Sequence, residues 1–487
     1  MEKNIKDCIY MIIENVDNFK ESEEEIYQLV CSIVRKKIKE VLKEIDNAIN
    51  ETCDNEIFEC HDTRERTIKT LVGPIKFERR YYIDSQGNYH HLLDEYLNLP
   101  SNDRQSPGLK EAAIKLIQDE SYRDSAEKLE ELLGVSTSHS AIHNWVQDLG
   151  NKIKKESQKK SKNLFEHGLI PGQSKNRLTI EHLFVEADGL HIYLQNEEKN
   201  SGELKLGIGY QGWEKRHPMS EEYRLSQKKY YGGVFDSEAF WKQTTAEMYE
   251  QYRFEEDSIT LLNGDGAFWV SSGLDYLPAF SVRFLDSFHY SRKIMVKLGR
   301  SSYVSRVFEA IKSGDKQALI EHLKEAKSYR KKKKDKKKVT ELKKYLLNHW
   351  EEIQNHYNSD LDLPEDMRGM GGMESNIDKV FANRFKKRGM RWSINGAENL
   401  AHIILADRNN VLEKWFSTIN WDIRKEKIKP QIKKAKKKNK TSLTAGEKET
   451  ADYMKAFKGN MPALEGPDAG KDWVKGMRNI ITSGSLI

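Results

Sequence analysis

Long apolar runs are missing from this sequence. The longest one near the amino end, "IYMII" (9–13), is shorter than the apolar segment of a secretion signal, and no segment has the roughly 20 apolar residues of a membrane-spanning helix. Charged residues make up 32% of the 487 residues, and the mean hydropathy is −0.77. We therefore expect a cytoplasmic protein with no membrane partner.

Cysteine is scarce, and its spacing argues against a zinc site. The chain has four cysteines and no Cys-x-x-Cys pair, and Cys53, Cys60 and His61 match no standard ligand spacing. Idle or buried thiols are therefore expected. Aromatic residues are plentiful, with 9 Trp, 21 Tyr and 17 Phe, which excludes a chain that is disordered throughout. The length suggests about three domains.

Positive charge is concentrated in two blocks, although the net charge is only +5. Seven lysines occur in "KKKKDKKK" (331–338), and nine lysines and one arginine occur in "RKEKIKPQIKKAKKKNK" (424–440). Such blocks repel themselves and suit a polyanion such as nucleic acid. A solvated linker or helix face has the same composition, so one block alone would decide nothing, and the presence of two favours nucleic acid.

Two segments with different periodicity open the chain. Residues 1–62 are expected to be helical, because apolar residues recur at helical spacing over 22–49. Residues 63–107 are expected to form a small antiparallel β region, because apolar and polar residues alternate over 67–99 between turn signals.

Residues 108–160 have the pattern of a helix-turn-helix DNA-binding unit. A helix that ends at Leu133, a turn at Gly134 and a second helix from about Ser138 define the pattern. Side chains near the start of such a second helix meet base edges in DNA-binding proteins. The candidate DNA-binding residues are Thr137, Ser138, His139 and His143. An ordinary helical hairpin fits the same pattern equally well.

A polar, basic linker is expected over 150–180, before an α/β domain over 180–410. Apolar strand-like runs alternate there with helical patterns, which is typical of a mixed sheet flanked by helices. The expected strands cover 182–194, 203–213, 228–235, 258–265 and 279–286, and the expected helices cover 237–252 and a segment that starts near His289.

Three further segments complete the expected organisation. A lysine-rich helical insertion interrupts the α/β domain at about 300–365, and a late helix lies within 371–393. A basic tail follows over 411–487.

Three acidic residues stand where strands or helices begin or end. The strand-like run "HLFVEAD" ends at Asp188 and "SITLLNGD" ends at Asp265, and each aspartate is followed by glycine. Strands of an α/β sheet deliver ligands at their carboxyl ends, and two carboxylates there repel unless a divalent cation lies between them. Glu374 opens the late helix, with Asp378 and Glu398 as alternatives. Ordinary turns and compensation of the helix dipole would produce the same residues.

The motifs around these acids resemble those of a bacterial insertion-sequence transposase family, the ISLre type, with an RNase H-like core of the D-D-E kind. The resemblance covers most of the chain and includes "GPIKFERRYY", "LLDEYLNLP", "VEADGLHI", "LLNGDGAFW", "GGMESNIDKVFANRFKKRGMRWS" and "NGAENLAHI". It also includes "DSFH" (286–289), which is similar to a patch that follows the second aspartate in Mutator-like transposases.

The resemblance implies a fold and an activity. Asp188, Asp265 and Glu374 would be the catalytic triad and would bind two Mg²⁺ ions, or Mn²⁺, roughly 3.5–4 Å apart. The implied enzyme has an RNase H-like α/β core, cuts transposon ends and joins their 3′-hydroxyls to target DNA. Its partners would be double-stranded DNA and further copies of the chain in a homodimer or higher oligomer, which would make the protein nucleoid-associated.

Other residues receive less specific roles. His289 is assigned to the active site or to the orientation of DNA, with a structural histidine as the alternative. Phosphate contacts are expected from Lys386, Lys387, Arg388 and Arg391, for which a solvated helix face is the alternative. A tryptophan could stack on a flipped base, but core packing is favoured for Trp241, Trp269 and Trp392.

Two other classes of protein fit parts of this pattern. An RNase H-like nuclease or junction resolvase would use the same acids to cleave DNA without joining it. A helix-turn-helix regulator would bind DNA and perform no chemistry. Paired carboxylates also occur in glycosidases, but the lysine blocks argue against a sugar substrate.

Overall fold

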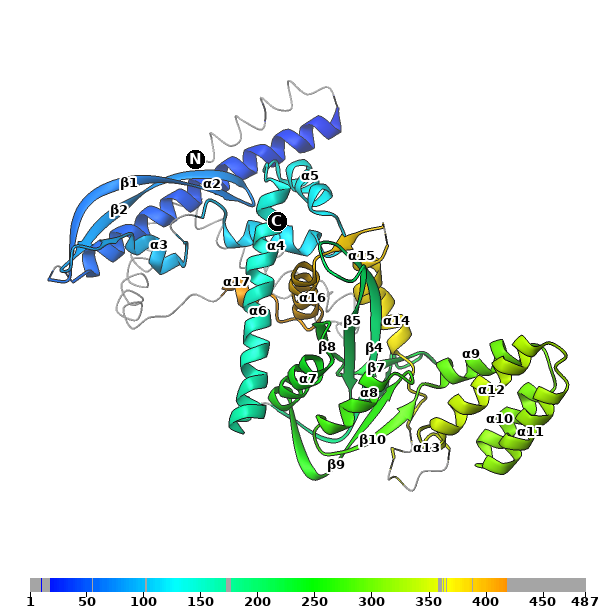
Figure 1. Cartoon of the computed structure of the whole chain (residues 1–487). Helices are drawn as coiled ribbons and strands as arrows, with labels where there is room; N and C mark the ends of the chain where they lie inside the picture. Colours follow the sequence, from blue (N-terminus) through cyan, green and yellow to red (C-terminus); the bar gives the residue numbers. More distant parts are fainter. Residues whose placement is uncertain are drawn as a thin grey trace. The chain divides into compact units, whose positions relative to one another are not determined.

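We analysed a computed structural model of the chain (Figure 1). It describes Tyr10 and residues 18–54, 56–100, 103–171, 177–357, 361, 363–364, 366–387 and 389–417. The described residues form two compact units. The first comprises those up to residue 109 together with 133–135, and the second comprises 110–132 and 136–417. Most of the predicted basic tail, including the lysine block at 424–440, lies outside the described residues.

The first unit packs one long helix on a small antiparallel sheet. Its elements are α2 (Phe19–Thr52), β1 (Phe58–Thr70), β2 (Gly73–Asp84), β3 (Tyr89–His90) and α3 (Leu92–Leu97). The strands pair in the order β1-β2-β3, and buried apolar side chains from α2, both long strands and α3 form its core. The helix over 22–49 is thus confirmed, and so is an antiparallel sheet, but its bounds differ from those expected. Strand β1 already begins at Phe58, within the region expected to be helical, and Leu92–Leu97 is a helix.

Three helices begin the second unit, and one is longer than the sequence suggested. They are α4 (Pro107–Leu116), α5 (Tyr122–Leu133) and α6 (His139–His167). The linker predicted over 150–180 is wrong for its first half, because α6 continues to His167 and ends at Gly168 with a φ of 64°. Small buried residues hold this polar helix against its neighbours α7 (Ser237–Gln251) and α16 (Ile394–Arg408), and a Cβ at Gly150 would collide with the backbone of Asn399.

A mixed sheet forms the centre of the second unit. Its strands are β4 (Leu178–Leu194), β5 (Ser201–Tyr210), β8 (Lys229–Val234), β9 (Tyr252–Gly264), β10 (Phe280–Leu285) and β11 (Arg391–Trp392). They pair in the order β10-β9-β4-β5-β8, and β11 adds to one end of β4. Among these described strands, β5 alone runs against its neighbours. The mixed α/β class expected from the sequence is confirmed.

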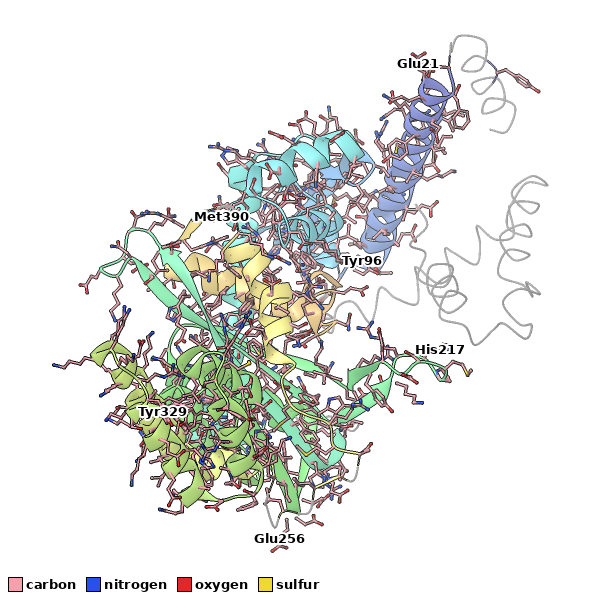
Figure 2. All side chains as sticks on the ribbon, turned by 90° about the vertical axis from the view of Figure 1, so that its right-hand side faces the viewer. Glu21, Tyr96, His217, Glu256, Tyr329 and Met390 are labelled. Carbon is pink, nitrogen blue, oxygen red and sulfur yellow. The ribbon has the colours of Figure 1, made fainter. Side chains whose placement is uncertain are left out.

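Alternation along β4 assigns its side chains to two faces. Leu183, Val185 and Ala187 belong to an apolar core with residues of α7 and β8. Phe184 and Glu186 therefore point to the opposite face, where Phe184 stacks on Tyr210. That face also carries a separate hairpin of β6 (Gly212–Lys215) and β7 (Tyr223–Ser226), whose loop contains His217 (Figure 2).

A helical insertion follows β10, as the sequence predicts. It contains α9 (Ser287–Leu298), α10 (Tyr303–Lys312), α11 (Lys316–Ser328), α12 (Lys333–Asn348) and α13 (Trp350–Gln354). These helices share one apolar core. In Figure 1 they lie beside the sheet as a separate group, and Figure 2 marks the group with Tyr329 at the end of α11.

The remaining described elements are short. After β9 come α8 (Phe268–Ser271) and the 3-10 turn η1 (Ser272–Asp275). The late helix predicted within 371–393 is confirmed as a continuous run of α14 (Met373–Ile377), the π-helical segment η2 (Asp378–Ala382) and α15 (Asn383–Phe385), and α17 (Lys414–Ser417) ends the described chain. None of the described helices is both long enough and apolar enough to cross a membrane.

Candidate metal centre

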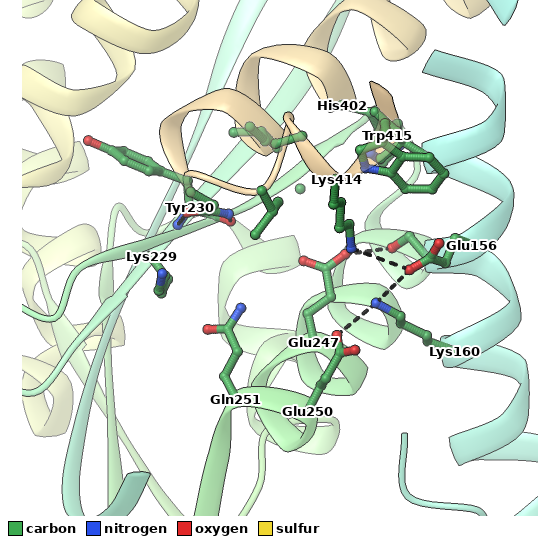
Figure 3. Close-up of a pocket in the computed structure, with 17 residues that line it drawn as sticks. Glu156, Lys160, Lys229, Tyr230, Glu247, Glu250, Gln251, His402, Lys414 and Trp415 are labelled. Atoms are coloured by element: carbon green, nitrogen blue, oxygen red, sulfur yellow. Dashed lines mark hydrogen bonds and ion pairs between the residues drawn. The ribbon is translucent and has the colours of Figure 1, made fainter. Parts of the chain in front are cut away.

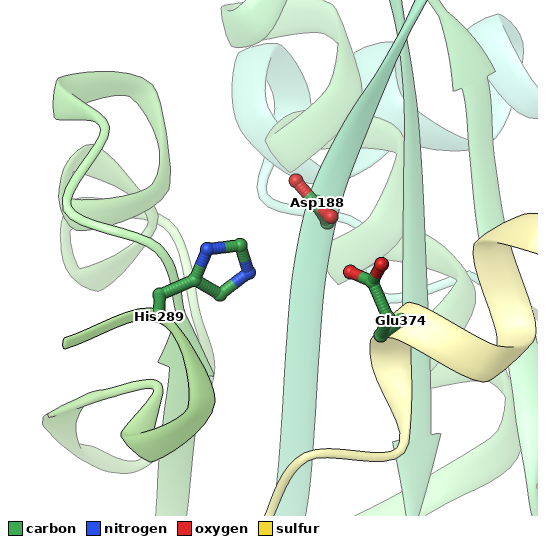
Figure 4. Close-up of side chains that lie close together, drawn as sticks. All are labelled: Asp188, His289 and Glu374. Carbon is green, nitrogen blue, oxygen red and sulfur yellow. The ribbon is translucent and has the colours of Figure 1, made fainter. Parts of the chain in front are cut away.

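Three side chains from distant parts of the sequence converge beside β4. Asp188 on β4, His289 on α9 and Glu374 on α14 each place one oxygen or nitrogen ligand atom within 4.8 Å of the others (Figure 4). Within the described part of the chain, they form the one group of three acidic, histidine or cysteine residues with this spacing. Two residues of the predicted triad are thus brought together, and His289 joins them.

Asp188 lies within its strand, which corrects the prediction that the strand ends there. Strand β4 continues for six more residues to Leu194, and Gly189 pairs with Lys205 of β5. The Asp-Gly pair does not break the strand, because the alternation of buried residues resumes at Leu190, Ile192 and Leu194. The side chain of Asp188 therefore leaves the sheet from its face, as does that of Glu186.

Asp265 directly follows β9 and lies next to Asp188 in register. The last pair of the parallel β4–β9 ladder is Ala187 with Gly264, so the two aspartates are the next residues on adjacent strands. The Asp265 carboxylate accepts a hydrogen bond from the backbone N–H of Ala267 at 2.9 Å. Asp265 is not part of the group of three, although its charge acts on Asp188.

The electrostatics of Asp188 reflect this crowding. Burial, together with the negative charges of Asp265 and Glu374, raises the pKa of its carboxyl from 3.8 to about 6. The backbone N–H of Gly189, 2.7 Å from one carboxylate oxygen, and the nearby His289 lower the same pKa and only partly offset the rise. The raised pKa of Asp188 therefore reflects mainly its burial, to which the two neighbouring carboxylates add.

Glu374 occupies the first turn of α14 and is exposed, so its carboxylate is open to a ligand. The two alternatives for the third acid are placed elsewhere. Asp378 is exposed and forms an ion pair with Lys387 at 3.4 Å. Glu398 is buried and pairs with Lys154 at 2.5 Å. Glu374 is therefore the acid of the late helix that reaches Asp188.

His289 belongs to the first turn of α9, which Asp286 caps by accepting a hydrogen bond from the N–H of Phe288 at 2.8 Å. Its imidazole lies 3.9 Å from the Asp286 carboxylate and points toward Asp188 in Figure 4. The aspartate of the "DSFH" segment thus caps a helix, and its histidine brings a ring nitrogen to the Asp188 group.

The sequence did not single out several residues around these acids. Glu186 is fully buried two positions before Asp188, and the alternation "VEAD" could have indicated that both point to one face. Lys293 lies four residues after His289 on α9, and its ammonium is 3.6 Å from the Tyr345 ring centroid. Burial lowers the pKa of Lys293, whereas the charge of Asp265 raises it. No pattern within the insertion marked Tyr345 as a neighbour of this site.

The predicted DNA-binding side chains of the helix pair differ in exposure. Thr137 is buried, so it is not available to DNA, and the Ser138 hydroxyl caps α6 by accepting a hydrogen bond from the N–H of Ala141. His139 and His143 are exposed, and the His143 ring packs edge-on against Tyr122 at 5.3 Å.

The predicted phosphate contacts lie beyond Glu374. Lys386, Lys387 and Arg391 are exposed, and Arg388 lies outside the described residues. The lysine block at 331–338 is part of α12 and its lead-in, with Lys331 to Lys334 exposed.

The tryptophans considered for base stacking lie in or against the core. Trp241 and Trp392 are buried, which confirms core packing for both. Trp269 is partly buried and packs against the apolar core that contains Trp241.

A second cluster of charged residues lines a cavity of about 270 Å³ between α6, α7, β8 and α16 (Figure 3). Its charges are largely paired, since Lys160 lies 3.1 Å from Glu156 and 2.7 Å from Glu250. The Ser157 hydroxyl donates to Glu247 at 2.7 Å. Burial lowers the pKa of His402, which also lines the cavity, to about 3. None of these residues belongs to the Asp188 group.

The donor set of the Asp188 group fits a divalent cation. Two carboxylates and one imidazole offer oxygen and nitrogen ligands, which suit Mg²⁺ or Mn²⁺ when oxygen ligands predominate. A cation would also neutralise the negative charge that raises the pKa of Asp188. The residues present therefore fit a metal centre.

Comparison with known proteins assigns the chain to a family. A UPF0236 protein of Caldanaerobacter subterraneus subsp. tengcongensis is 27% identical over 473 residues, which cover 91% of this chain and 93% of the relative. Another from the same organism is 26% identical over 442 residues, 88% of this chain and 87% of the relative. A UPF0236 protein in the vanSb 3′ region of Streptococcus gallolyticus is 25% identical over 410 residues, 83% of this chain and 86% of the relative.

These findings correct the resemblance drawn from the sequence motifs. Membership of the ISLre-type transposase family is not supported, because the matching family model and these relatives carry the name UPF0236 and none carries a transposase or D-D-E name. The family model matches residues 12–421, far more than half of the sequence. The chain belongs to the uncharacterised protein family UPF0236.

Proposed function

We propose that this protein is a divalent-metal-dependent DNA transposase, which cuts DNA at the ends of a mobile element and joins the 3′-hydroxyls to target DNA. The observation that carries the proposal is the convergence of Asp188, His289 and Glu374 within 4.8 Å, with Asp265 in register beside Asp188. Converging acids, one of which has a raised pKa, are characteristic of catalytic metal sites.

The sheet supports an RNase H-like core as the scaffold of this site. Its first strand, β4, is central, its second strand runs antiparallel, and its last two strands add in parallel on the other side. An RNase H-like core has a mixed sheet of this kind. The acids would then come from the first strand, from the end of the fourth strand and from a helix after the sheet.

Each residue of the site has a role in this proposal. Asp188, Glu374 and His289 would hold the cations, with Asp265 completing the site from the adjacent strand. When bound, a pair of divalent cations activates the attacking hydroxyl and stabilises the leaving oxygen of phosphodiester cleavage. Lys293, whose pKa responds to the charge of Asp265, is close enough to this site to attract the DNA phosphate.

Other parts of the chain support DNA as the substrate. The exposed lysines of α12 and the exposed cations after Glu374 supply the positive charge that DNA binding requires. The α5–α6 pair, with exposed His139 and His143 at the start of the second helix, would act as a helix-turn-helix. We also propose a homodimer or higher oligomer, because joining two element ends requires two sites.

One relative favours strand joining over cleavage alone. The name of a similar Caldanaerobacter protein combines eleven locus designations. A protein found at many loci of one genome is what repeated transposition of its gene leaves behind. An RNase H-like nuclease or resolvase without strand transfer remains the second candidate, and a non-catalytic DNA-binding regulator is the third.

The test is a cleavage assay with the full chain and DNA that carries the sequences flanking its gene. We expect cleavage with Mg²⁺ or Mn²⁺, none with EDTA, and none with Asp188→Asn or Glu374→Gln, while both variants still bind DNA. Asp378→Asn is the matched control, because Asp378 is an exposed acid on the same helical run that pairs with Lys387. Full cleavage by either site variant would refute the proposal.

A second assay separates the candidate functions. Pre-cleaved ends with free 3′-hydroxyls are mixed with a circular target. A transposase joins them, whereas a nuclease leaves the target unchanged. A regulator gives neither reaction and binds one operator regardless of metal.

A further inference from the structure

We propose that Glu186 is a positioning residue that holds Glu374 at the metal centre, an inference that rests on the proposed metal site. Glu186 is fully buried on β4, two residues before Asp188. Its carboxylate lies at the start of the helix that carries Glu374. Strand β4 would therefore supply the metal ligand Asp188 directly and would fix the ligand Glu374 through Glu186.

The hydrogen bonds of Glu186 connect the strand to the late helix. One carboxylate oxygen accepts from the N–H of Gly372 at 3.2 Å, and the other accepts from the N–H of Met373 at 3.2 Å. These N–H groups belong to the first turn of the helical run over 373–385 and to the residue before it. Glu374 is the next residue, so its backbone cannot move away from β4 while both bonds are kept.

The other side of the carboxylate is held by the sheet. The Tyr210 hydroxyl on β5 donates to Glu186 at 2.8 Å, and the Asn263 amide on β9 donates at 3.5 Å. Both residues lie on strands that are paired with β4. The anchor is therefore fixed to three strands, and its position does not depend on the flexible glutamate side chain alone.

These contacts favour a carboxylate and lower the pKa of Glu186, against the larger rise that burial causes. All four neighbours donate, so an ionised glutamate accepts from each of them, and the helix N-terminus favours its negative charge. Glutamine has the same shape, but its NH₂ group would replace one of the two accepting oxygens and would face groups that also donate. The change to glutamine therefore removes the hydrogen bonds that this oxygen accepts and leaves the packing nearly unchanged.

The glycines before Glu374 allow this close approach. Gly371 has a φ of 154°, a backbone conformation that residues with a Cβ rarely adopt. A Cβ added to Gly372 would lie 3.1 Å from a Leu225 methyl and 3.4 Å from a Glu186 oxygen. The "GMGG" segment thus brings the backbone N–H groups up to the buried carboxylate.

The experiment measures Mn²⁺ binding to the full chain by calorimetry, with cleavage as a second readout. Because partners that orient metal ligands typically contribute 10–100-fold to affinity, we expect Glu186→Gln to weaken Mn²⁺ binding at least about tenfold. Cleavage by this variant should need correspondingly more Mn²⁺ and recover when the metal is saturating. A residue that only supports the fold would not shift the metal dependence.

Glu247→Gln is the matched control. Glu247 also accepts a side-chain hydrogen bond within the same unit, but from Ser157 of α6, and it lines the cavity of Figure 3. We expect this control to keep the Mn²⁺ affinity of the unmodified protein. If Glu186→Gln and Glu247→Gln both bind Mn²⁺ as the unmodified protein does, the positioning role is refuted.

A second variant and the comparison of Mn²⁺ binding with DNA cleavage cover the remaining outcomes of this experiment. If Glu186→Gln does not fold, Glu186→Asp keeps the charge but is one methylene too short to reach the helix. Weaker Mn²⁺ binding by Glu186→Asp supports the anchor, and unchanged binding refutes it. Mn²⁺ binding that depends on Glu186 without any DNA cleavage supports the anchor and refutes the proposed function, whereas an unmodified protein that binds no Mn²⁺ refutes both.

Discussion

Two clusters of acids in the second unit differ in how their charge is balanced. Around the cavity of Figure 3, Lys160 lies between Glu156 and Glu250, and Lys414 lies 3.7 Å from Glu156. Around Asp188, the neighbouring charged groups include two more acids, Asp265 and Glu374, and the partial compensation comes from His289 and a backbone N–H.

This difference in charge balance distinguishes acids that stabilise the fold from acids that bind a ligand. Acids paired with lysines hold helices together and need no ligand, whereas converging acids that lack such partners destabilise the fold until a cation binds. Both clusters contain acids that sequence motifs alone would treat alike. The balance of charge around them, which depends on the fold, distinguishes the two.

The largest expected effect is the pH dependence of metal binding. The folded pKa of Asp188 is raised to about 6, so below pH 6 a proton competes with the cation for this carboxylate. We expect Mn²⁺ affinity to fall about tenfold per pH unit below pH 6, and to be nearly constant above pH 7. Calorimetric titrations from pH 5 to 8 measure it, and the same slope in Asp188→Asn would show that another group titrates.

A smaller effect concerns stability without metal. Because the pKa of Asp188 is raised from 3.8 to about 6, its contribution to stability is complete below pH 4 and is lost as the pH rises through 6. At pH 7 the buried charge is a cost, so we expect Asp188→Asn to stabilise the metal-free protein by about 1–3 kcal/mol in urea unfolding.

Lys160→Ala should change the free energy of unfolding in the opposite direction to Asp188→Asn. It removes the cation shared by Glu156 and Glu250 and should destabilise the protein by about 1–3 kcal/mol. If both variants shift stability in the same direction, the two clusters do not differ in charge balance as described. Mn²⁺ should stabilise the unmodified protein but not Asp188→Asn.

The smallest effect tests the exposed lysines of α12. Cations at a helix N-terminus oppose the helix dipole, so the lysines at 331–338 are not there to stabilise α12. We expect their replacement by glutamine to leave stability nearly unchanged and to weaken DNA binding. The slope of log affinity against log salt should fall by about 0.9 for each phosphate that the block no longer neutralises, and an unchanged slope would leave the block as a solvated helix face.

Much of the fold could be predicted because its signals are local. Alternation predicted β2 and the end of β1, an apolar strand-like run predicted β5, helical spacing predicted α2, and the lysine-rich insertion was recognisable by composition. The extension of α6 was missed because its buried face consists of small polar residues such as Ser157 and Ser161, which carry no apolar period. A strand over 182–194 was expected and ends where β4 ends, but the interpretation of Asp188-Gly189 as the end of a strand was wrong, because pairing with β5 continues past Asp188.

The sequence by itself determined the chemical types available to this protein: isolated acids beside glycines, a histidine in a helix start, and lysines in blocks. Only the tertiary structure decided which of them meet. It brought Glu374 to Asp188 from a distant part of the sequence, with buried Glu186 bonded to the two residues before Glu374, and it left Asp378 and Glu398 in ion pairs. The reason is physical, since a metal centre depends on distances and charge balance in space, and spacing along the chain encodes neither.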